Sequence, residues 1–388
     1  MGAAFSRDLA DLSSRLEAAP TVELPKMSKI IKSDGFDFIP HSRPTLGTEE
    51  IKAVSEVIAS GHIAEGAIVK EFEQKFADYL DVKHAVATNS GTSALHLALL
   101  ALEVGPGDEV IIPSYVCCAL LNAVNYAGAT AVLADICPNT YNLDAADVKK
   151  RLSSRTKVII VPHLFGMAAD LDPLLALDVP IIEDCAQAVG AVYNQRPVGT
   201  FGVAAIYSFY ATKVITTGEG GMVVCNAKDI AERIRDLKTY DQKDDYKIRF
   251  NYKMSDIQAV LGLAQLAQLN TILRRRKAIA EQYTRAFKVL DLNLPPDDSG
   301  QIFFRYVIGL KTDSRSGIEA LSRKGIGCDR PVYLPLHRQI KLKGYPVTEK
   351  AWKNSLSLPI YPSLTDEAVT RVIDAVLDTA LKIPCIFK

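Results

Sequence analysis

The chain has 388 residues, which is more than one hydrophobic core normally serves, so a large domain and a smaller one are expected. Apolar residues make up 48% of it, which excludes global disorder, and 45 basic residues balance 45 acidic ones, which gives no support to binding of nucleic acid or an anionic membrane. The seven cysteines show no metal-binding spacing and no run of about 18 apolar residues occurs, so we expect no metal, no transmembrane helix and a cytoplasmic protein with reduced thiols.

The first elements predicted along the chain are helical. Residues 1–38 are expected to form an N-terminal arm, in which leucines recur at helical spacing from Leu9 to Leu16. One helix is predicted from Thr48 to Gly61, and a second one from Val69 to Leu80.

Strands and helices then alternate. The predicted strands lack polar alternation, which is typical of a mostly parallel sheet covered on both faces. They are Ala85–Ala87, Glu109–Ile112, Thr130–Ala134, Val158–Val161, Pro180–Ile182, Ala204–Tyr207 and Met222–Val224. Such sheets bind ligands beyond the carboxyl ends of their strands.

The last third of the chain is predicted to contain long helices and the smaller domain. Met254–Leu273 is predicted as one long helix, which passes through the basic run Arg274–Lys277 into another. A strand over Phe304–Gly309 and a closing helix over Asp366–Leu381 belong to the smaller α/β unit. The expected domains are therefore residues 39–285 and 286–388.

A lysine lies in a loop between two of the apolar strands. Lys213 follows the strand Ala204–Tyr207, and a glycine cluster then returns the chain to Met222–Val224. Desolvation at the mouth of a buried sheet lowers the pKa of a lysine, and the neutral amine attacks aldehydes. The alternative is a solvated surface lysine beside a turn.

Other strand ends contain groups that suit a charged ligand. The stretch 89–95 (NSGTSAL) opens a helix, where it either binds an anion such as phosphate or only caps the helix. Asp184 ends another strand, where it either holds a cationic ring or caps a helix. His163 also follows a strand, as a site residue or as a structural histidine.

These groups share one economical explanation. A phosphate site, a carboxylate for a ring nitrogen and a lysine that binds an aldehyde are the three groups that pyridoxal 5′-phosphate (PLP) requires. Each loop follows a strand of one sheet, so the groups can converge.

Six motifs, in this order, resemble those of the DegT/StrS-type nucleotide-sugar aminotransferases, which are fold-type I PLP enzymes. They are IPHSRPTLGTEEIKAV (39–54), NSGTSALHLAL (89–99), GDEVIIPSY (107–115), IIEDCAQAVGA (181–191), SFYATKVITTGEGGM (208–222) and NYKMSDIQAVLGLAQL (251–266). The resemblance covers residues 39–388. It implies an α/β fold with a large PLP-binding domain around a mostly parallel sheet and a smaller C-terminal α/β domain.

The resemblance also implies a role for each matching residue. Lys213 would bind the cofactor and move protons, Asp184 would pair with the ring nitrogen, and Gln187 would bind the 3-oxygen. The phosphate of the cofactor would be bound by Gly91, Thr92, Ser208 and, from the neighbouring subunit of a homodimer, Asn251. The substrate would lie near His163, Tyr333 and His337.

The chain departs from the family pattern around the cofactor. Cys117 occupies the place where the family often has an aromatic residue that stacks on the ring, and Tyr115 is the substitute candidate. The family's common Gly-Trp near the substrate appears here as Gly61-His62. These departures are expected to affect the choice of substrate more than the type of reaction.

The implied reaction is transfer of an amino group from an amino acid, with L-glutamate expected, to a keto-deoxy sugar linked to a nucleotide. Sugar dehydratases of the same fold are a rival, but those relatives replace the lysine with histidine, whereas this chain keeps Lys213. A non-catalytic regulatory or sensor protein is a second rival. A P-loop NTPase is excluded because no GxxxxGK[ST] motif occurs.

Overall fold

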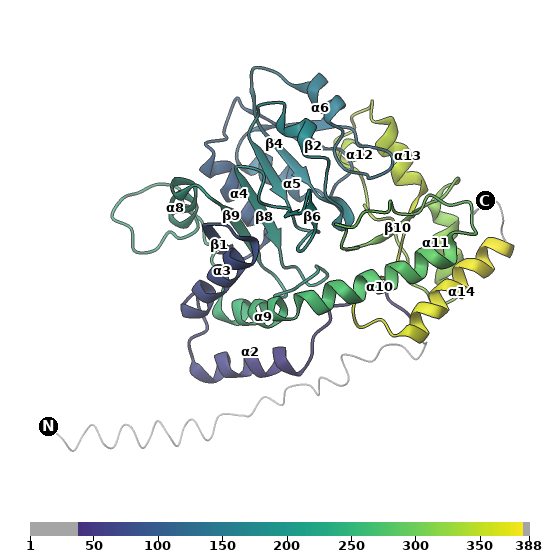
Figure 1. Ribbon diagram of the computed structural model, residues 1–388. Helices are drawn as coiled ribbons and strands as arrows, with labels where there is room; N and C mark the ends of the chain where they lie inside the picture. The colour runs from purple at the N-terminus through teal and green to yellow at the C-terminus, as the bar shows by residue number, and fades with distance from the viewer. Residues whose placement is uncertain (1–37, 383–388) are drawn as a thin grey trace, which may run out of the picture. The chain divides into compact units, whose positions relative to one another are not determined.

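The structure is a computed structural model that describes residues 38–382. The predicted N-terminal arm, apart from Phe38, lies outside the described residues. From Ile39 on, these residues form one compact unit (Figure 1). Within the described part of the chain, no helix combines the length and the apolar character that a bilayer-spanning helix needs.

A seven-stranded sheet lies at the centre of this unit (Figure 1). Neighbouring strands are parallel, except that β9 is antiparallel to β1 and β8. All seven predicted strands are present, and the mostly parallel α/β fold is confirmed. In spatial order they are β1 (His84–Thr88), β9 (Gly221–Cys225), β8 (Ala204–Ser208), β5 (Ile181–Asp184), β4 (Thr156–Pro162), β2 (Glu109–Pro113) and β3 (Thr130–Ala134).

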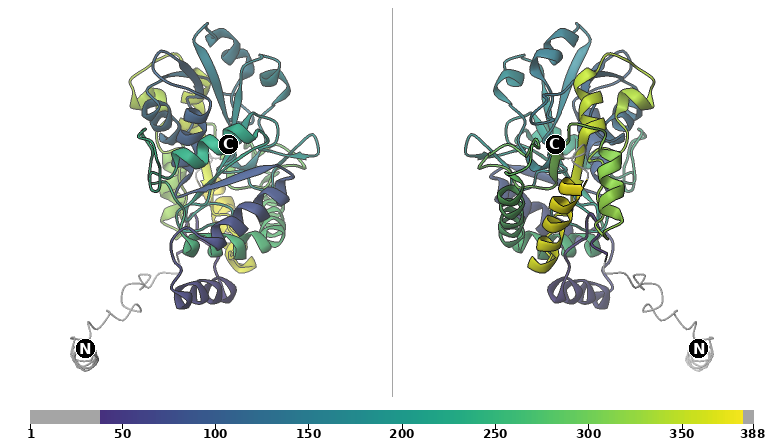
Figure 2. Two further views of the ribbon diagram at one scale, coloured as in Figure 1. Left: turned by 90° about the vertical axis from the view of Figure 1, so that its left-hand side faces the viewer. Right: turned by 90° about the vertical axis from the view of Figure 1, so that its right-hand side faces the viewer.

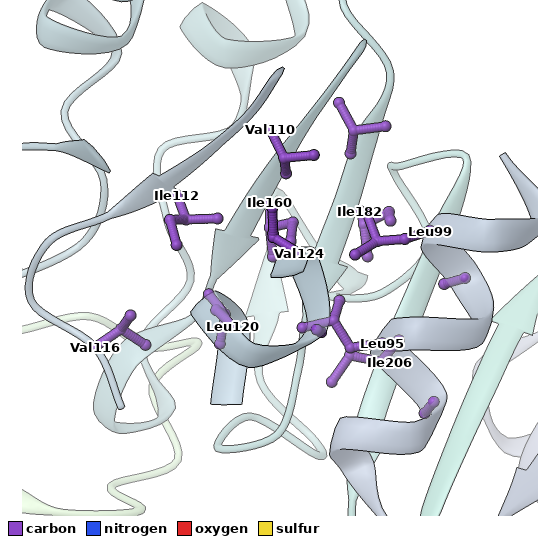
Figure 3. Close-up of a cluster of buried hydrophobic side chains, with 14 of the residues drawn as sticks. Leu95, Leu99, Val110, Ile112, Val116, Leu120, Val124, Ile160, Ile182 and Ile206 are labelled. Carbon is purple, nitrogen blue, oxygen red and sulfur yellow. The ribbon is translucent and has the colours of Figure 1, made fainter. Parts of the chain in front are cut away.

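Helices cover both faces of the sheet because successive strand residues point to opposite sides. In β2, Val110 and Ile112 pack into one core cluster and Ile111 into another. Figure 3 shows the first cluster, where Leu95 and Leu120 approach the sheet from two helices. The helices of that face include α4 (Gly91–Ala101), α5 (Ala119–Tyr126) and α8 (Lys228–Leu237); α3 (Ala67–Leu80) and α6 (Ala145–Arg151) pack into clusters of the opposite face.

The long helix predicted over Met254–Leu273 is wrong, because the chain forms two helices there. Helix α9 (Asp256–Ala267) ends and α10 (Leu269–Phe287) begins at Gln268. The side-chain amide of Gln268 donates to Glu50 of α2 (Thr48–Ser60) at 2.7 Å, and its backbone N–H bonds to the carbonyl of Gln265, three residues back. A tertiary contact thus sets a break that helix propensity does not predict.

The second half of the unit contains a two-stranded antiparallel sheet. Its strands are β10 (Tyr306–Gly309) and β11 (Ser355–Leu358). Helix α14 (Asp366–Lys382) lies beside α10 near this sheet (Figures 1 and 2). The domain boundary expected near residue 285 falls inside α10. The remaining elements are α7 (Asp172–Leu175), β6 (Val192–Tyr193), β7 (Arg196–Pro197), α11 (Ser314–Ser322), α12 (Leu336–Gln339), α13 (Pro346–Asn354) and a 3-10 turn over Leu164–Gly166.

Candidate active site

Lys213 lies in the loop that joins β8 to β9, residues 209–220, which we call the lysine loop. Because the two strands are antiparallel neighbours, the loop begins and ends at the same edge of the sheet. The N–H of Phe209 donates to the carbonyl of Gly220 at 2.8 Å, and the N–H of Thr217 donates to the carbonyl of Phe209 at 2.9 Å. The base of the loop is therefore fixed by backbone hydrogen bonds.

Within residues 38–382, Lys213 Nζ forms no hydrogen bond or ion pair. Its Nζ lies 5.4 Å from the centroid of the Phe304 ring. Burial lowers the pKa of the lysine below its ordinary value, while the negative forms of Cys117 and Asp184 act in the opposite direction. The amine is thus closer to its neutral, nucleophilic form than an exposed lysine is.

Asp184 is the last residue of β5 and is buried beside this lysine. Its Oδ1 accepts the N–H of Ala186 at 3.0 Å. Burial raises the pKa of Asp184, and the Ala186 hydrogen bond and the charge of Lys213 partly offset that effect. A buried carboxylate of this kind favours a cationic partner, such as a protonated ring nitrogen.

The N-terminus of α4 approaches the same sheet edge very closely. A Cβ on Gly91 would lie 2.8 Å from the Cβ of Ser208, and a Cβ on Gly221 would lie 2.3 Å from the carbonyl oxygen of Ser90. Only glycine fits at both positions. The Ser90 hydroxyl caps the helix by accepting the N–H of Ser93 at 3.1 Å, while Gly91 and Thr92 form its first turn. The first-turn amides and the Ser208 hydroxyl form a cradle for an anion.

These residues fit PLP. The cradle suits its phosphate, the buried Asp184 suits its ring nitrogen, and the partly buried Lys213 suits its aldehyde. Lys213 and Asp184 are near enough for their charges to interact. Both lie at the end of the parallel strands where ligands of such sheets bind.

His163 is fully buried, and both of its ring nitrogens form hydrogen bonds. Nδ1 accepts the N–H of Ala169 at 3.0 Å, so Nε2 carries the proton and donates to Glu183 at 3.0 Å. The Glu183 carboxylate also accepts three backbone N–H groups, from Gly199, Phe201 and Gly202. The structure thus places His163 in a saturated network rather than at an open surface.

His337 and Tyr333 lie in the segment that leads into and through α12. Both nitrogens of His337 are engaged: Nδ1 with the hydroxyl of Ser114 at 2.6 Å, and Nε2 with the carboxylate of Glu349 at 2.7 Å. Tyr333 is 88% exposed, and its carbonyl accepts the indole N–H of Trp352. The structure ties His337 to the residue that follows β2 and leaves the Tyr333 ring free.

The last two predicted site residues are Gln187 and Asn251. Gln187 is half-buried, and its Oε1 accepts the N–H of Phe165 at 2.9 Å. The side chain of Asn251 is exposed, while its backbone carbonyl accepts the side-chain amide of Asn89, just before α4. Asn251 therefore lies at the surface next to the cradle of its own chain.

The wall around Lys213 contains residues that the motifs did not assign. Tyr115 is fully buried, and its ring packs against those of Tyr141 and Phe165. Cys117 is an exposed residue, but burial of its thiol raises the pKa of that group, and the proximity of Lys213 partly offsets the shift. The charge of Arg305 also acts on Lys213, and in the sequence Arg305 was only one residue of the predicted strand Phe304–Gly309.

Known proteins resemble this chain over most of its length. Residues 44–377 match the DegT/DnrJ/EryC1/StrS aminotransferase family. GDP-perosamine synthase from Caulobacter vibrioides is 39% identical over 81% of this chain and 91% of its own length. Spore coat polysaccharide biosynthesis protein SpsC from Bacillus subtilis is 36% identical over 88% of this chain and 97% of its own length.

Solved structures show the same fold. The aminotransferase TlmJ from Streptoalloteichus hindustanus superposes with a TM-score of 0.85 and 33% identity, over 89% of this chain and 100% of TlmJ. The PLP form of the putative sugar aminotransferase Spr1654 from Streptococcus pneumoniae gives 0.84 and 28% identity, over 89% of this chain and 99% of that one. The chain therefore belongs to the DegT/DnrJ/EryC1/StrS aminotransferase family, and the aminotransferase activity and PLP cofactor that its motifs predict are confirmed.

Proposed function

We propose that the protein transfers an amino group from an amino acid, with L-glutamate as the expected donor, to a keto-deoxy sugar linked to a nucleoside diphosphate. The observation that carries the proposal is the partly buried Lys213 beside the buried Asp184, at the sheet edge where α4 begins. The similarity to a GDP-perosamine synthase supports a nucleotide-linked sugar as the acceptor.

The chemistry divides between the cofactor and the chain. PLP, when bound, supplies a ring that accepts electrons from the carbon that loses its proton. Lys213 would hold the aldehyde carbon of the cofactor and would serve as the base that moves the proton of the donor's α-carbon. Asp184 would pair with the protonated ring nitrogen. Gln187 would offer its amide nitrogen to the 3-oxygen, because the N–H of Phe165 already donates to its carbonyl oxygen.

Two other functions are compatible with the fold. A sugar dehydratase of this fold would have histidine where this chain has Lys213, and a regulatory protein would not need a lysine with a lowered pKa. The state of Lys213 therefore favours the aminotransferase.

We further propose a cytoplasmic homodimer with shared active sites. The exposed Asn251 side chain is available to the phosphate of a neighbouring subunit's cofactor. A wide, largely apolar groove lies next to α9, lined by Val57, Ile63, Ile68 and Val260 among others. A second copy that covers this groove would remove its apolar lining from solvent.

Turnover of keto-sugar nucleotides tests the proposal. Purified protein loaded with PLP is mixed with L-glutamate, and 2-oxoglutarate release is followed with a panel of keto-sugar nucleotides. We expect at least one sugar to be aminated and the visible absorption of lysine-bound PLP to fade with glutamate alone. Lys213→Ala should lose both signals. Full turnover by that variant, or no response of the wild type to any amino acid, would contradict the proposal.

A further inference from the structure

The 3-10 turn over Leu164–Gly166 contains a strained residue just beyond the carboxyl end of β4. Phe165 has φ 59° and ψ 16°, which is the left-handed region of backbone conformation. A bulky residue rarely adopts this conformation, because its Cβ crowds the following carbonyl group. Such strain persists only where surrounding contacts hold it, and it is frequent at functional sites.

Buried contacts hold the turn in this conformation. Phe165 is itself buried, and its ring packs edge-on against that of Tyr141, with 5.6 Å between the ring centroids. Oδ1 of the buried Asn142 accepts the N–H of Leu164 at 2.8 Å, and Nδ2 of the same residue donates to two backbone carbonyls just after the turn. These bonds fix the backbone on both sides of Phe165.

On one side, the turn and the residue before it contact two residues of the cofactor site. The N–H of His163 donates to the backbone carbonyl of Asp184 at 3.1 Å. The N–H of Phe165 donates to Oε1 of the half-buried Gln187 at 2.9 Å. Among residues 38–382, Nε2 of Gln187 forms no hydrogen bond. Fixing the amide oxygen therefore leaves the amide nitrogen available to a ligand.

On its other side, the same turn holds the segment that lies over the lysine. The carbonyl of Gly166 accepts the N–H of Ile302 at 2.9 Å. A Cβ on Gly166 would lie 2.8 Å from the backbone nitrogen of Phe304, so the two segments are in direct contact. The centroid of the Phe304 ring lies 5.4 Å from Lys213 Nζ. The turn therefore contacts the cofactor site on two sides.

The orientation of the Gln187 amide decides what it can bind. A primary amide has a donor end and an acceptor end of nearly the same shape, and a half-turn about its terminal bond exchanges them. The 3-oxygen of PLP, which is negatively charged once it has lost its proton, requires the donor end. The Phe165 N–H selects this orientation because it occupies the amide oxygen.

We propose that Phe165 is a positioning residue, whose left-handed backbone aims the N–H that turns the Gln187 amide toward the 3-oxygen of the cofactor. The inference rests on the role proposed for Gln187. The strained backbone has a use in this arrangement, because a relaxed turn would direct the N–H elsewhere and leave the amide free to rotate.

An optical titration of the PLP-loaded protein reports the orientation of the amide without turnover. The visible absorption of lysine-bound PLP changes as the proton shared by its nitrogen and its 3-oxygen is lost. A donor to the 3-oxygen favours the deprotonated form, because that form carries more negative charge on the oxygen. Loss of the donor should therefore raise the pKa measured from the absorption.

Two isomeric side chains separate the effect of the Phe165 backbone from that of its ring. Phe165→Leu and Phe165→Ile both remove the ring, but the β-branched isoleucine resists the left-handed conformation more strongly. Phe165→Ile should titrate about 1 pH unit above Phe165→Leu, which is the scale of one hydrogen bond to a charged oxygen. If Phe165→Ile does not fold, Phe165→Val and Phe165→Ala give the same comparison.

A second background shows whether the effect passes through the amide. Gln187→Leu should itself titrate above the wild type, and addition of Phe165→Ile or Phe165→Leu to it should give equal values, since no amide is left to orient. Lys341, an exposed residue with φ 59°, supplies the control. Lys341→Ile should lower the midpoint of thermal unfolding and leave the optical titration unchanged.

The outcomes distinguish this inference from the proposed function. Equal titrations of Phe165→Ile and Phe165→Leu, a difference that persists without the Gln187 amide, or an unshifted titration in Gln187→Leu would each overturn the positioning role. If the Phe165 difference depends on Gln187 but no keto-sugar nucleotide is aminated, the proposed function fails and the positioning role stands. Amination by a protein whose two Phe165 variants titrate alike gives the reverse result.

Discussion

Replacement of Glu183 by glutamine would test the buried network below the cofactor site. One carboxylate oxygen accepts His163 Nε2 and the N–H of Gly199, and the other accepts the N–H groups of Phe201 and Gly202. An amide has only one acceptor oxygen. In one orientation of the new side chain its NH₂ group therefore faces the buried donors of His163 and Gly199, and in the other it faces the half-buried N–H groups of Phe201 and Gly202.

A tautomer change of His163 does not repair the network, because Nδ1 accepts the N–H of Ala169. A buried donor that loses its acceptor costs about 1–3 kcal/mol and a half-buried one costs less, so Glu183→Gln should lower the free energy of unfolding by roughly 1–3 kcal/mol. Urea unfolding followed by circular dichroism measures this change. Glu319→Gln, whose side chain is 58% exposed, is the control and should stay within about 0.5 kcal/mol of wild type. Equal midpoints for Glu183→Gln and wild type would refute the assigned network.

Two further predictions concern the cradle and the pH response. Gly91→Ala should weaken PLP binding by about tenfold in a fluorescence titration, because the new Cβ would lie 2.8 Å from the Cβ of Ser208; unchanged affinity would show that the cradle yields. The pKa of Glu349 is lowered from 4.5 to about 2, first by Arg338 and, against burial, by His337. Its ionised form stabilises the fold above pH 4.5 and loses that effect as the pH falls toward 2. Glu349→Gln should reduce this loss of unfolding free energy at low pH. An unchanged pH dependence would show that the Glu349–Arg338 ion pair does not stabilise the fold.

Sequence patterns predicted the central sheet because its signal is local. Each strand, such as Val158–Val161, is a short apolar run between helices, and burial on both faces leaves no polar alternation to obscure it. The β11 strand, Ser355–Leu358, was missed because it has only four residues and follows α13 without a connecting loop, although its alternating serines and leucines are typical of a strand.

The site residues that lie within the family motifs could be predicted from the sequence. Lys213, Asp184 and Gly91 were assigned from strand ends and from the family resemblance, and the structure brings them to one edge of the sheet. The saturation of His163 and the pairing of Arg305 with His41 depend on contacts between segments far apart in the chain. No spacing in the sequence encodes such contacts.

The antiparallel placement of β9 has a consequence for the motions of the catalytic lysine. A connection to a parallel strand can open together with its helix, but the two ends of the lysine loop are hydrogen-bonded to each other and continue directly into two adjacent, buried strands. The amide protons of Phe209 and Thr217 cannot then reach solvent by fraying of a terminus or a single helix. They should exchange only when the central sheet itself opens, so the lysine loop belongs to the slowest-exchanging cooperative unit of the protein.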